Sequence, residues 1–306
     1  MSSLTLRDEV AEALRRGRPV VALESTIISH GLPRPRNLEA ARELEALLRD
    51  AGVTPATIAV LDGEPRVGLD DEALRRIAEE DLAKASVRDL PILAARRGSA
   101  ATTVAATAYL AARAGIRVFA TGGLGGVHRG ASESFDESAD LDVLADTPIA
   151  VVSAGVKSVL DIGATLERLE SLSVPVVGYR TDEFPAFWLR SSGHRLDWRI
   201  EEAAEAAEIL RASTSLGLRA GLLVANPVPE GEQWDAEEHD RVLSEAFAAA
   251  AASGVRGKAV TPFLLAHIVD ASGGVSLEVN LALARNNVRL AAGIARALAG
   301  TPPVSR

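Results

Sequence analysis

Two short apolar runs that end in small residues constrain the fold of this chain more than any other feature. The runs are Ile116–Thr121 and Pro148–Ser153, and both are rich in β-branched residues. Runs of this kind are typical of buried parallel strands. Gly122–Gly126 follows the first run, and Ala154-Gly155 follows the second. Because an open α/β sheet binds its ligand beyond the carboxyl ends of its strands, the sequence predicts a ligand crevice here.

The rest of the chain alternates between strand-like and helix-like segments. Strands are expected at 20–23, 57–61, 174–179 and 220–225, and helices at 5–16, 37–50, 99–115, 155–171, 199–214, 235–253, 261–271 and 276–298. Such alternation predicts a parallel sheet with helices on both faces. We therefore expect an α/β fold, a three-layer α/β/α sandwich around a mostly parallel central sheet, as a single domain over residues 1–306.

The composition limits the partners of the protein. A net charge of −9 argues against broad binding to nucleic acid or to an anionic membrane. No apolar run is long enough to span a membrane, and the first residues predict an amphipathic helix rather than a signal peptide. The chain has no cysteine, which excludes disulfides, thiolate catalysis and cysteine-ligated zinc. We expect a cytoplasmic protein that acts on a small molecule.

Lysine is rare in this chain. Of the 33 basic residues, only Lys84, Lys157 and Lys258 are lysines. Arginine stays protonated in proteins, whereas a buried lysine can become a neutral amine. A lysine kept in an arginine-rich chain is therefore a candidate for chemistry that arginine cannot perform, and chance retention is the alternative.

Lys157 is the leading candidate for a nucleophile. It follows the second apolar run, and we expect it in the first turn of the helix 155–171. The positive end of a helix and burial both lower the pKa of a lysine. A neutral lysine amine can form a Schiff base with a sugar. The structural alternative is a solvated lysine at a helix start.

Acidic residues supply the other candidate groups. Glu24 directly follows the strand 20–23, where a buried carboxyl suits general-acid work, and a hydrogen bond to nearby backbone is the alternative. Asp136, Asp140 and Asp142 lie in a polar loop. Oxygen ligands favour Mg²⁺ or Mn²⁺ over zinc, although an acidic loop is usually only solvated.

The start of the alanine-rich helix 99–115 is a candidate phosphate site. Its first amides and the hydroxyls of Thr102 and Thr103 suit an anion, with simple capping as the alternative. The run GGLGG is a weak signal, because it matches neither of the common nucleotide-binding glycine motifs. From the residues alone, the prediction is an α/β enzyme with a lysine nucleophile and a candidate site for a divalent cation.

Several longer motifs resemble the pseudouridine-5'-phosphate glycosidase family. They are VALESTIISHGLPRPRN, ATGGLGGVHRGA, FDESADL, SAGVKSVLD, VANPVPE and TPFLL, and the resemblance runs from about Pro19 to about Arg289. It implies cleavage of the carbon–carbon glycosidic bond of pseudouridine 5'-phosphate, which gives uracil and ribose 5-phosphate in a reversible reaction. It also implies a homotrimer with one Mn²⁺ per subunit and an α/β/α core.

The resemblance assigns roles to individual residues. Glu24 in ALEST matches the proton donor, Lys157 in AGVKS matches the nucleophile, and Asp136 in FDES matches the metal ligand. Together with Thr103 from the start of the helix, the expected substrate-binding residues are Lys84, Val104, His128, Ser138, Ala139, Asp140 and Asn280.

The chemistry of the residues agrees with this reaction. A carbon leaving group has no lone pair to protonate, unlike the oxygen of ordinary glycosides. A lysine amine at C1' can instead open the sugar ring and supply an imine-type electron sink, which makes the cleavage retro-aldol-like. We expect Glu24 to protonate the ring oxygen, Lys84 and residues 102–104 to hold the 5'-phosphate, and Asp140 to orient the base or relay its proton.

Two other classes of function stay open at this point. A ribokinase-like sugar kinase also uses glycine-rich loops on an α/β sheet, although the chain contains no Gly-Ala-Gly-Asp run. A non-catalytic sensor of sugar phosphates is the other alternative. It would bind ribose 5-phosphate without needing the Lys157 amine.

Overall fold

The computed structural model describes residues 4–255 and 260–300, so Lys258 lies outside the described residues. Within them, eleven strands form one sheet in the order β1-β4-β3-β2-β7-β9-β13-β11-β12, with β6 beside β3 and β5 beside β6. The two strands outside this sheet, β8 and β10, form a separate pair. The strands are β1 (Thr5–Leu6), β2 (Val20–Leu23), β3 (Thr54–Leu61), β4 (Glu64–Val67), β5 (Ala83–Ala85), β6 (Ala100–Thr102), β7 (Val118–Ala120), β8 (Val127–His128), β9 (Ala150–Ser153), β10 (Leu160–Asp161), β11 (Val176–Tyr179), β12 (Arg199–Ile200) and β13 (Leu222–Ala225).

The centre of the sheet is parallel, as the sequence predicted. Strands β2, β7, β9 and β13 pair side by side in one direction. Among the described strands of this sheet, antiparallel pairing occurs only where β4 and β6 join β3, and the separate β8–β10 pair is antiparallel as well. All four central strands are buried along their length, which explains why their sequences are continuous apolar runs.

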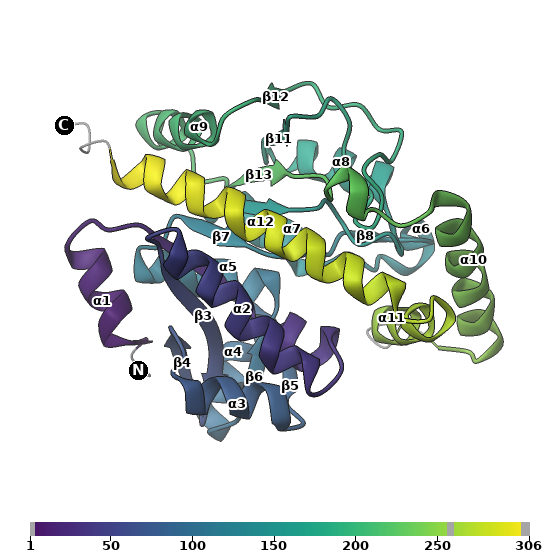
Figure 1. The fold of residues 1–306 in the computed structure, drawn as a ribbon, viewed down its shortest axis with the longest axis horizontal. Coiled ribbons are helices and arrows are strands. Elements are labelled where there is room, and N and C mark those ends of the chain that lie inside the picture. Colours follow the sequence, from purple (N-terminus) through teal and green to yellow (C-terminus); the bar gives the residue numbers. More distant parts are fainter. Residues whose placement is uncertain (1–3, 256–259, 301–306) are drawn as a thin grey trace.

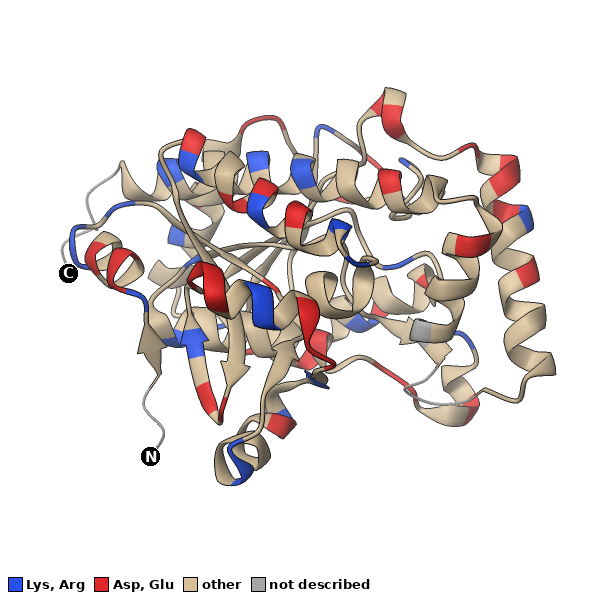
Figure 2. Ribbon diagram, turned by 60° about the horizontal axis from the view of Figure 1, so that its bottom comes forward, with Lys and Arg blue, Asp and Glu red and all other residues tan. Residues whose placement is uncertain are grey.

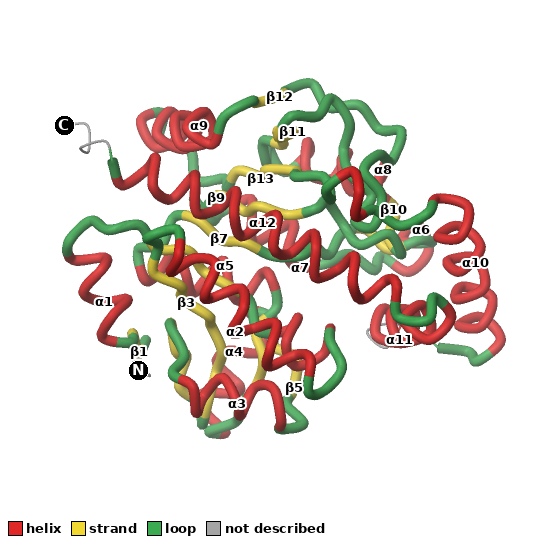
Figure 3. Tube along the Cα trace, in the orientation of Figure 1, coloured by secondary structure: helices red, strands yellow, loops and turns green. Residues whose placement is uncertain are grey.

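Helices cover both faces of this sheet. The long helix α12 (Val275–Ala299) lies across one face beside α2 (Arg36–Asp50) and α9 (Ala203–Ser215) (Figure 1). Helices α5 (Val104–Ala114) and α7 (Ala139–Ala145) pack together on the opposite side of the strands. Figure 3 shows the strands as a central layer between the helices, which is the predicted three-layer α/β/α sandwich. The remaining helices are α1 (Asp8–Arg15), η1 (Ile27–Gly31), α3 (Asp71–Glu79), η2 (Val87–Asp89), α4 (Leu90–Arg96), α6 (Ala131–Ser134), α8 (Ile162–Ser171), η3 (Glu230–Glu232), α10 (Ala236–Ala252) and α11 (Val260–Ala271).

Four predicted helix starts are wrong. The helix predicted at 199–214 begins only at Ala203, because residues 199–200 form β12 and pair with β11. At the N-terminus, residues 5–6 form β1 and the helix begins only at Asp8. Residues 100–102 form β6 rather than the first turn of α5, because they pair with β3 and β5. The predicted helix 155–171 begins only at Ile162, because Leu160 and Asp161 pair with β8. In all four cases a tertiary contact overrides a local helix preference.

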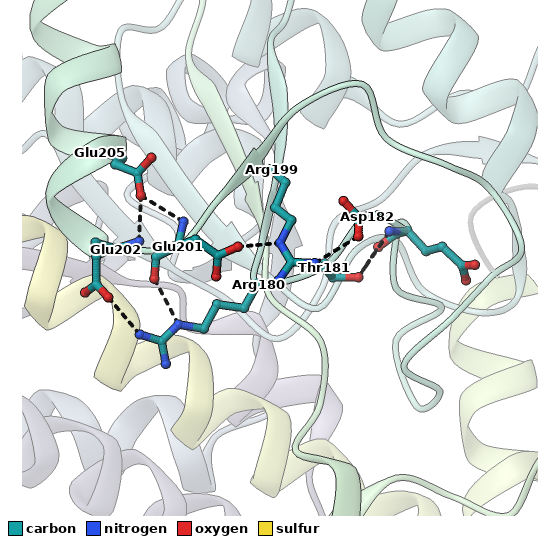
Figure 4. A network of polar contacts seen from close by, with 8 residues as sticks. Arg180, Thr181, Asp182, Arg199, Glu201, Glu202 and Glu205 are labelled. Carbon is teal, nitrogen blue, oxygen red and sulfur yellow. Dashed lines mark hydrogen bonds and ion pairs between the residues drawn. The ribbon is translucent and has the colours of Figure 1, made fainter.

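The outer edge of the sheet, at β12, is covered by charged side chains. Arg199 forms ion pairs with Asp182 at 2.8 Å and with Glu201 at 2.6 Å, and Arg180 reaches Glu202 at 3.2 Å (Figure 4). Charges on an edge strand oppose pairing with another sheet. This edge of the sheet is therefore protected from pairing with another strand.

Charges of both signs are spread over the surface. Figure 2 shows Lys and Arg interspersed with Asp and Glu along the helices in that view, without a continuous basic face. Among the described residues, no helix is both long enough and apolar enough to cross a membrane.

Candidate active site

The carboxyl ends of the central strands form one edge, where the predicted site residues gather. In the register of the sheet, Leu23 lies opposite Ala120, Ala120 lies opposite Val152, and Ser153 lies opposite Ala225. The residue after each strand is therefore brought to the same edge of the sheet. This arrangement confirms the predicted convergence of the two glycine-containing turns.

Glu24 is the first residue after β2, and its carboxyl group is held on both sides. Its side chain is buried, with 8% of the residue exposed. Thr26 donates its hydroxyl hydrogen to one carboxyl oxygen, and Thr121, which follows β7, donates to the other. The two hydroxyls fix the carboxyl group at the start of the crevice.

Lys157 lies in a turn between β9 and β10, not in the first turn of a helix. Its Nζ donates a hydrogen bond to the carbonyl oxygen of Gly123 at 2.9 Å. Burial lowers the pKa of Lys157 below its ordinary value, and the positive charge of Lys84 acts in the same direction. The negative charges of Glu24 and Asp140 oppose that change. Burial, not a helix dipole, thus favours the neutral amine.

The Ser138–Asp140 run lies against the glycine turn after β7. Asp140 accepts one hydrogen bond from the Gly125 amide and another from the Ala105 amide, both at 2.8 Å. Ser138 caps α7, and its own amide bonds to the carbonyl of Gly126 at 3.0 Å. A Cβ at Gly125 would lie 2.3 Å from Ser138 Oγ, so only glycine fits this approach. Ala139, between them, is exposed.

The expectation that Thr102 binds a phosphate is wrong, because the residue is fully buried and its hydroxyl donates to the Ile58 carbonyl at 2.7 Å. The other predicted phosphate residues lie next to one another, but the start of α5 is partly occupied. Thr103 bonds to the backbone of Ala85 at 2.9 Å, which places it beside Lys84 on β5. Its hydroxyl accepts from the Ala106 amide, and the amide of Ala105 is taken by Asp140. Within the described residues, the Val104 amide has no hydrogen-bond partner. An anion at this helix start would therefore use the Val104 amide first.

His128 and Asp136 form a more open corner of the site. The His128 amide donates to the Asp136 carbonyl at 3.0 Å, and His128 Nδ1 lies 3.9 Å from Asp136 Oδ2. The side chain of Asp136 is 38% exposed. Among the described residues, no group of three or more His, Cys, Asp or Glu side chains could hold a metal ion. Asp142 points elsewhere, because it pairs with Arg168 at 3.3 Å.

Asn280 reaches the site from helix α12. Its Oδ1 is buried and has no hydrogen-bond partner among the described residues. A Cβ added at Gly122 would lie 3.3 Å from this oxygen, so Asn280 faces the glycine turn. A buried acceptor without a hydrogen-bond partner lowers the stability of the folded protein. Such a group is typical of a binding site in which the ligand supplies the donor.

Sequence reasoning missed the buried pair of Asn226 and Asn287. Asn287 is fully buried in α12 and donates to the carbonyls of Thr121 at 2.7 Å and Gly122 at 3.3 Å. It accepts a hydrogen bond from Asn226 at 2.9 Å. The available signal was a polar residue on an otherwise apolar helix face. The pair fixes the backbone on which Glu24 and Lys157 depend.

Comparisons with known proteins place this arrangement in a family. The sequence model of the family described as "Indigoidine synthase A like protein" matches residues 9–297. A relative from Nocardioides sp. (strain ATCC BAA-499 / JS614), named pseudouridine-5'-phosphate glycosidase, is 59% identical over 97% of each chain. The chain therefore belongs to the indigoidine synthase A-like family, and within it to the pseudouridine-5'-phosphate glycosidases.

Two solved structures share the fold. The prealnumycin C-glycosynthase AlnA, in complex with ribulose 5-phosphate, is 37% identical with a TM-score of 0.91 over 98% of each chain. An indigoidine synthase A (IdgA)-like protein from Thermotoga maritima is 40% identical with a TM-score of 0.88, covering 97% of this chain and 96% of its own. Both support the α/β fold described above.

Proposed function

We propose that this protein cleaves the carbon–carbon glycosidic bond of pseudouridine 5'-phosphate, giving uracil and ribose 5-phosphate in a reversible reaction. The observation that carries the proposal is the half-buried Lys157, whose amine is held by the Gly123 carbonyl at 2.9 Å and whose pKa is lowered by burial. The names of the relatives support the same activity. A C-glycosynthase of the same fold, solved with a pentulose phosphate, supports a sugar-phosphate substrate.

In the first step, the Lys157 nitrogen attacks C1' while the bond from C1' to the ring oxygen breaks. Glu24 gives its proton to that oxygen, so the sugar opens as an alcohol. The amine must be neutral to attack, and its burial beside Gly123 favours the neutral form. The two threonine hydroxyls keep the Glu24 carboxyl in place for this transfer.

In the second step, a proton adds to C5 of the base and the bond between C1' and C5 breaks. Its electron pair returns to the base as the nitrogen lone pair forms the C1'=N bond. Water then hydrolyses the imine to the aldehyde of ribose 5-phosphate and the free lysine. Of the two roles expected for Asp140, orienting the base fits better than relaying a proton, because both of its oxygens already accept backbone amides.

The remaining site residues bind the two ends of the substrate. Lys84, Thr103 and the Val104 amide are assigned to the 5'-phosphate, since they lie together at the end of β5 and the start of α5. Ser138, Ala139, His128 and Asn280 are assigned to the base and sugar hydroxyls. The unpartnered Oδ1 of Asn280 suits a donor on the ligand.

Asp136 would hold one Mn²⁺ per subunit. Its carboxylate is accessible, and a single carboxylate with several waters is a common way to bind a cation of this class. The lack of a larger cluster among the described residues fits such a water-rich site and not a closed cage. When bound, the ion supplies positive charge for the carbonyl oxygens of uracil. Asp136 and His128 orient the uracil end of the substrate.

The family resemblance also supports a homotrimer and a cytoplasmic location for this chain. Light scattering coupled to size-exclusion chromatography would measure the subunit number, and a monomer or dimer would contradict the first. Fractionation of cells that make the protein would test the second.

The activity has a direct test. Ultraviolet absorbance should follow conversion of pseudouridine 5'-phosphate to uracil, without ATP, with and without Mn²⁺. Borohydride added with ribose 5-phosphate should attach a reduced sugar-phosphate mass to the peptide that contains Lys157. Active enzyme labelled elsewhere, or not labelled, would contradict the imine route. The kinase alternative is not favoured by the relatives, and a kinase would consume ATP without releasing uracil.

A further inference from the structure

The segment Phe184–Trp188, between β11 and β12, packs directly behind the turn that holds the candidate nucleophile. It is irregular in conformation, yet its three aromatic residues are buried, at 0% for Phe184 and 3% for Phe187 and Trp188. Loops usually run over the surface of a protein. Burial of this loop beside the crevice indicates that its side chains have a functional role there.

The segment contacts both glycine turns of the site. A Cβ at Gly155 would lie 2.2 Å from the carbonyl oxygen of Pro185, and a Cβ at Gly123 would lie 2.6 Å from the Phe187 ring. Neither turn could carry a side chain beside this loop. The Gly123 residue that touches Phe187 is the one whose carbonyl accepts the Lys157 amine. The Phe187 ring is therefore one residue removed from the nucleophile.

Phe187 holds a backbone conformation that phenylalanine rarely adopts. Its φ is 65°, in the left-handed region, where a bulky residue is an outlier. Its amide bonds to the carbonyl of Ala154 at 3.0 Å, so the conformation is fixed by the end of β9. Strain of this kind persists only where the surroundings determine it, and it clusters at functional sites. Glycine would relieve the strain, but it would remove the ring that fills the space beside Gly123.

Two side-chain hydrogen bonds tie the segment to the other walls of the site. The hydroxyl of Ser158, next to Lys157, donates to the carbonyl of Ala186 at 2.5 Å. The Trp188 indole donates to the carbonyl of Ser276 at 3.0 Å. Ser276 lies in the first turn of α12, one turn before Asn280. The loop thus links the lysine turn to the helix that carries a predicted substrate contact.

We propose that Phe184–Trp188 is a positioning segment, in which Phe187 presses on Gly123 so that its carbonyl holds the Lys157 amine in line for attack. The proposal rests on the proposed function, because it concerns the geometry of the same amine. Phe187 is a positioning residue and touches no reacting atom. Glu24, Asp140 and Lys84 are the charged groups that face the amine from β2, α7 and β5, and none of them belongs to this segment.

The first experiment trims the ring. Phe187→Leu and Phe187→Ala are compared with wild type for kcat, for KM, and for the rate of borohydride trapping at saturating ribose 5-phosphate. Because small misplacements far from the chemistry can cost about a hundredfold, we expect kcat and the trapping rate to fall by roughly 10- to 100-fold in Phe187→Ala. Phe187→Leu should retain an intermediate rate. KM should change little, since the phosphate and base contacts lie on other elements.

Trp234→Phe is the matched control. Trp234 is equally buried and stacks edge-on against Trp188 at 5.6 Å, so it belongs to the same aromatic cluster. It does not rank among the nearest atoms to a Cβ at Gly123 or Gly155. Its substitution should lower the melting temperature but leave the trapping rate per folded molecule unchanged. An equal loss of trapping in this control would show a general packing effect and overturn the proposal.

The second experiment is a double-mutant cycle with Gly123→Ala. The new methyl group would meet the Phe187 ring at 2.6 Å, so the single variant should be strongly impaired in trapping. In Gly123→Ala/Phe187→Ala the ring is gone and only the Gly155 carbonyl oxygen, 3.2 Å from the new methyl group, stays close, so the double variant should be only slightly slower than Phe187→Ala alone. Such non-additivity is the signature of direct contact. Additive losses would overturn the proposed contact.

The outcomes separate this proposal from the proposed function. Wild-type enzyme that is not trapped at Lys157 would contradict the imine route itself. Wild type that is trapped, together with folded Phe187→Ala that is trapped at the same rate, would overturn only the positioning segment. If Phe187→Ala does not fold, the same comparison is made with Phe187→Leu and with Trp188→Phe, which keeps an aromatic ring but loses the bond to Ser276 and part of the ring packing against Trp234.

Discussion

The two halves of the candidate site are built in opposite ways. The half on the central strands is closed: Glu24 is 8% exposed, and the Lys157 amine is bonded to a backbone carbonyl. The half on β5 and the loop before α7 is open, with Lys84 exposed and the side chain of Asp136 38% exposed. The same residue type, lysine, occurs in both halves. The difference lies in the amount of water around it.

This contrast indicates that the closed half carries out the chemical step and that the open half binds the phosphate and the cation. Burial makes an amine more nucleophilic because it disfavours the charged form, and it also strengthens every electrostatic contact around the reacting atoms. A phosphate and a hydrated cation, in contrast, are costly to strip of water. An open half can hold them without that cost. We therefore expect substitutions in the closed half to affect kcat and substitutions in the open half to affect KM or metal dependence.

The largest expected effect separates the two lysines. Lys157→Arg should lower kcat by at least about 10⁴-fold, because a guanidinium stays protonated and cannot attack the sugar. Lys84→Arg, the matched change in the open half, should keep turnover, because a phosphate needs only a positive donor. Steady-state kinetics on both purified variants would check this. Comparable losses of kcat in the two variants would break the contrast.

The second expected effect lies in the closed half. Glu24→Gln removes the proton that goes to the ring oxygen and should lower kcat by roughly 10²- to 10⁴-fold, with little change in KM. Thr121→Val removes one of the two hydroxyls on the carboxyl group and should cost less. Single-turnover measurements of uracil release would rank the three enzymes. A Thr121→Val variant as slow as Glu24→Gln would show that the threonine does more than hold the carboxyl group.

The third expected effect sharpens the description of the open half. Asp136→Asn should raise the Mn²⁺ concentration needed for half-maximal activity by at least the roughly 10- to 100-fold that is typical of losing a partner around a metal. Borohydride trapping of ribose 5-phosphate on Lys157 should remain, because the free sugar carries no base to be oriented. A chelator added to wild type should reproduce this pattern. Loss of trapping in Asp136→Asn would place Asp136 in the closed half.

The sequence predicted the position of the crevice because that feature is local. Strand ends such as Thr121 and Ser153 can be read from apolar runs that stop at small residues, and parallel pairing then brings Glu24 and the glycine turns together. The same runs predicted the central parallel sheet and the position of Lys157 after the second of its strands. Lys84 and Asp140, whose roles come from the resemblance, lie close enough to this edge for their charges to affect the pKa of Lys157.

The parts that could not be predicted depend on distant contacts. Lys157 lies in a turn and not in a helix because Leu160 pairs with His128 and because Pro185 approaches Gly155. No window of sequence around Lys157 contains this information. The side-chain bonds of the buried Asn37 to the carbonyls of Ile28 and Ala78 are equally absent from any local window of sequence. Each of these contacts involves a partner more than eight residues away.

The smallest expected effect concerns stability and tests whether the closed half is costly to build. Because burial lowers the pKa of Lys157 in the folded protein, the unfolded chain binds this proton more tightly. Between the lowered folded pKa and the unfolded pKa of about 10.4, the free energy of unfolding should rise with pH by at most about 1.4 kcal/mol per pH unit from this group. Below that window, the folded state bears the full cost of the buried charge.

Lys157→Met removes this contribution while keeping a side chain of similar length. The variant should be more stable than wild type at pH 7, and its advantage should shrink as the pH rises toward the unfolded pKa. Urea unfolding at several pH values would measure the difference, with Lys84→Met as the control in the open half. A Lys157→Met variant whose stability follows wild type in parallel at every pH would mean that the amine is not desolvated, and the contrast between the two halves would lose its physical basis.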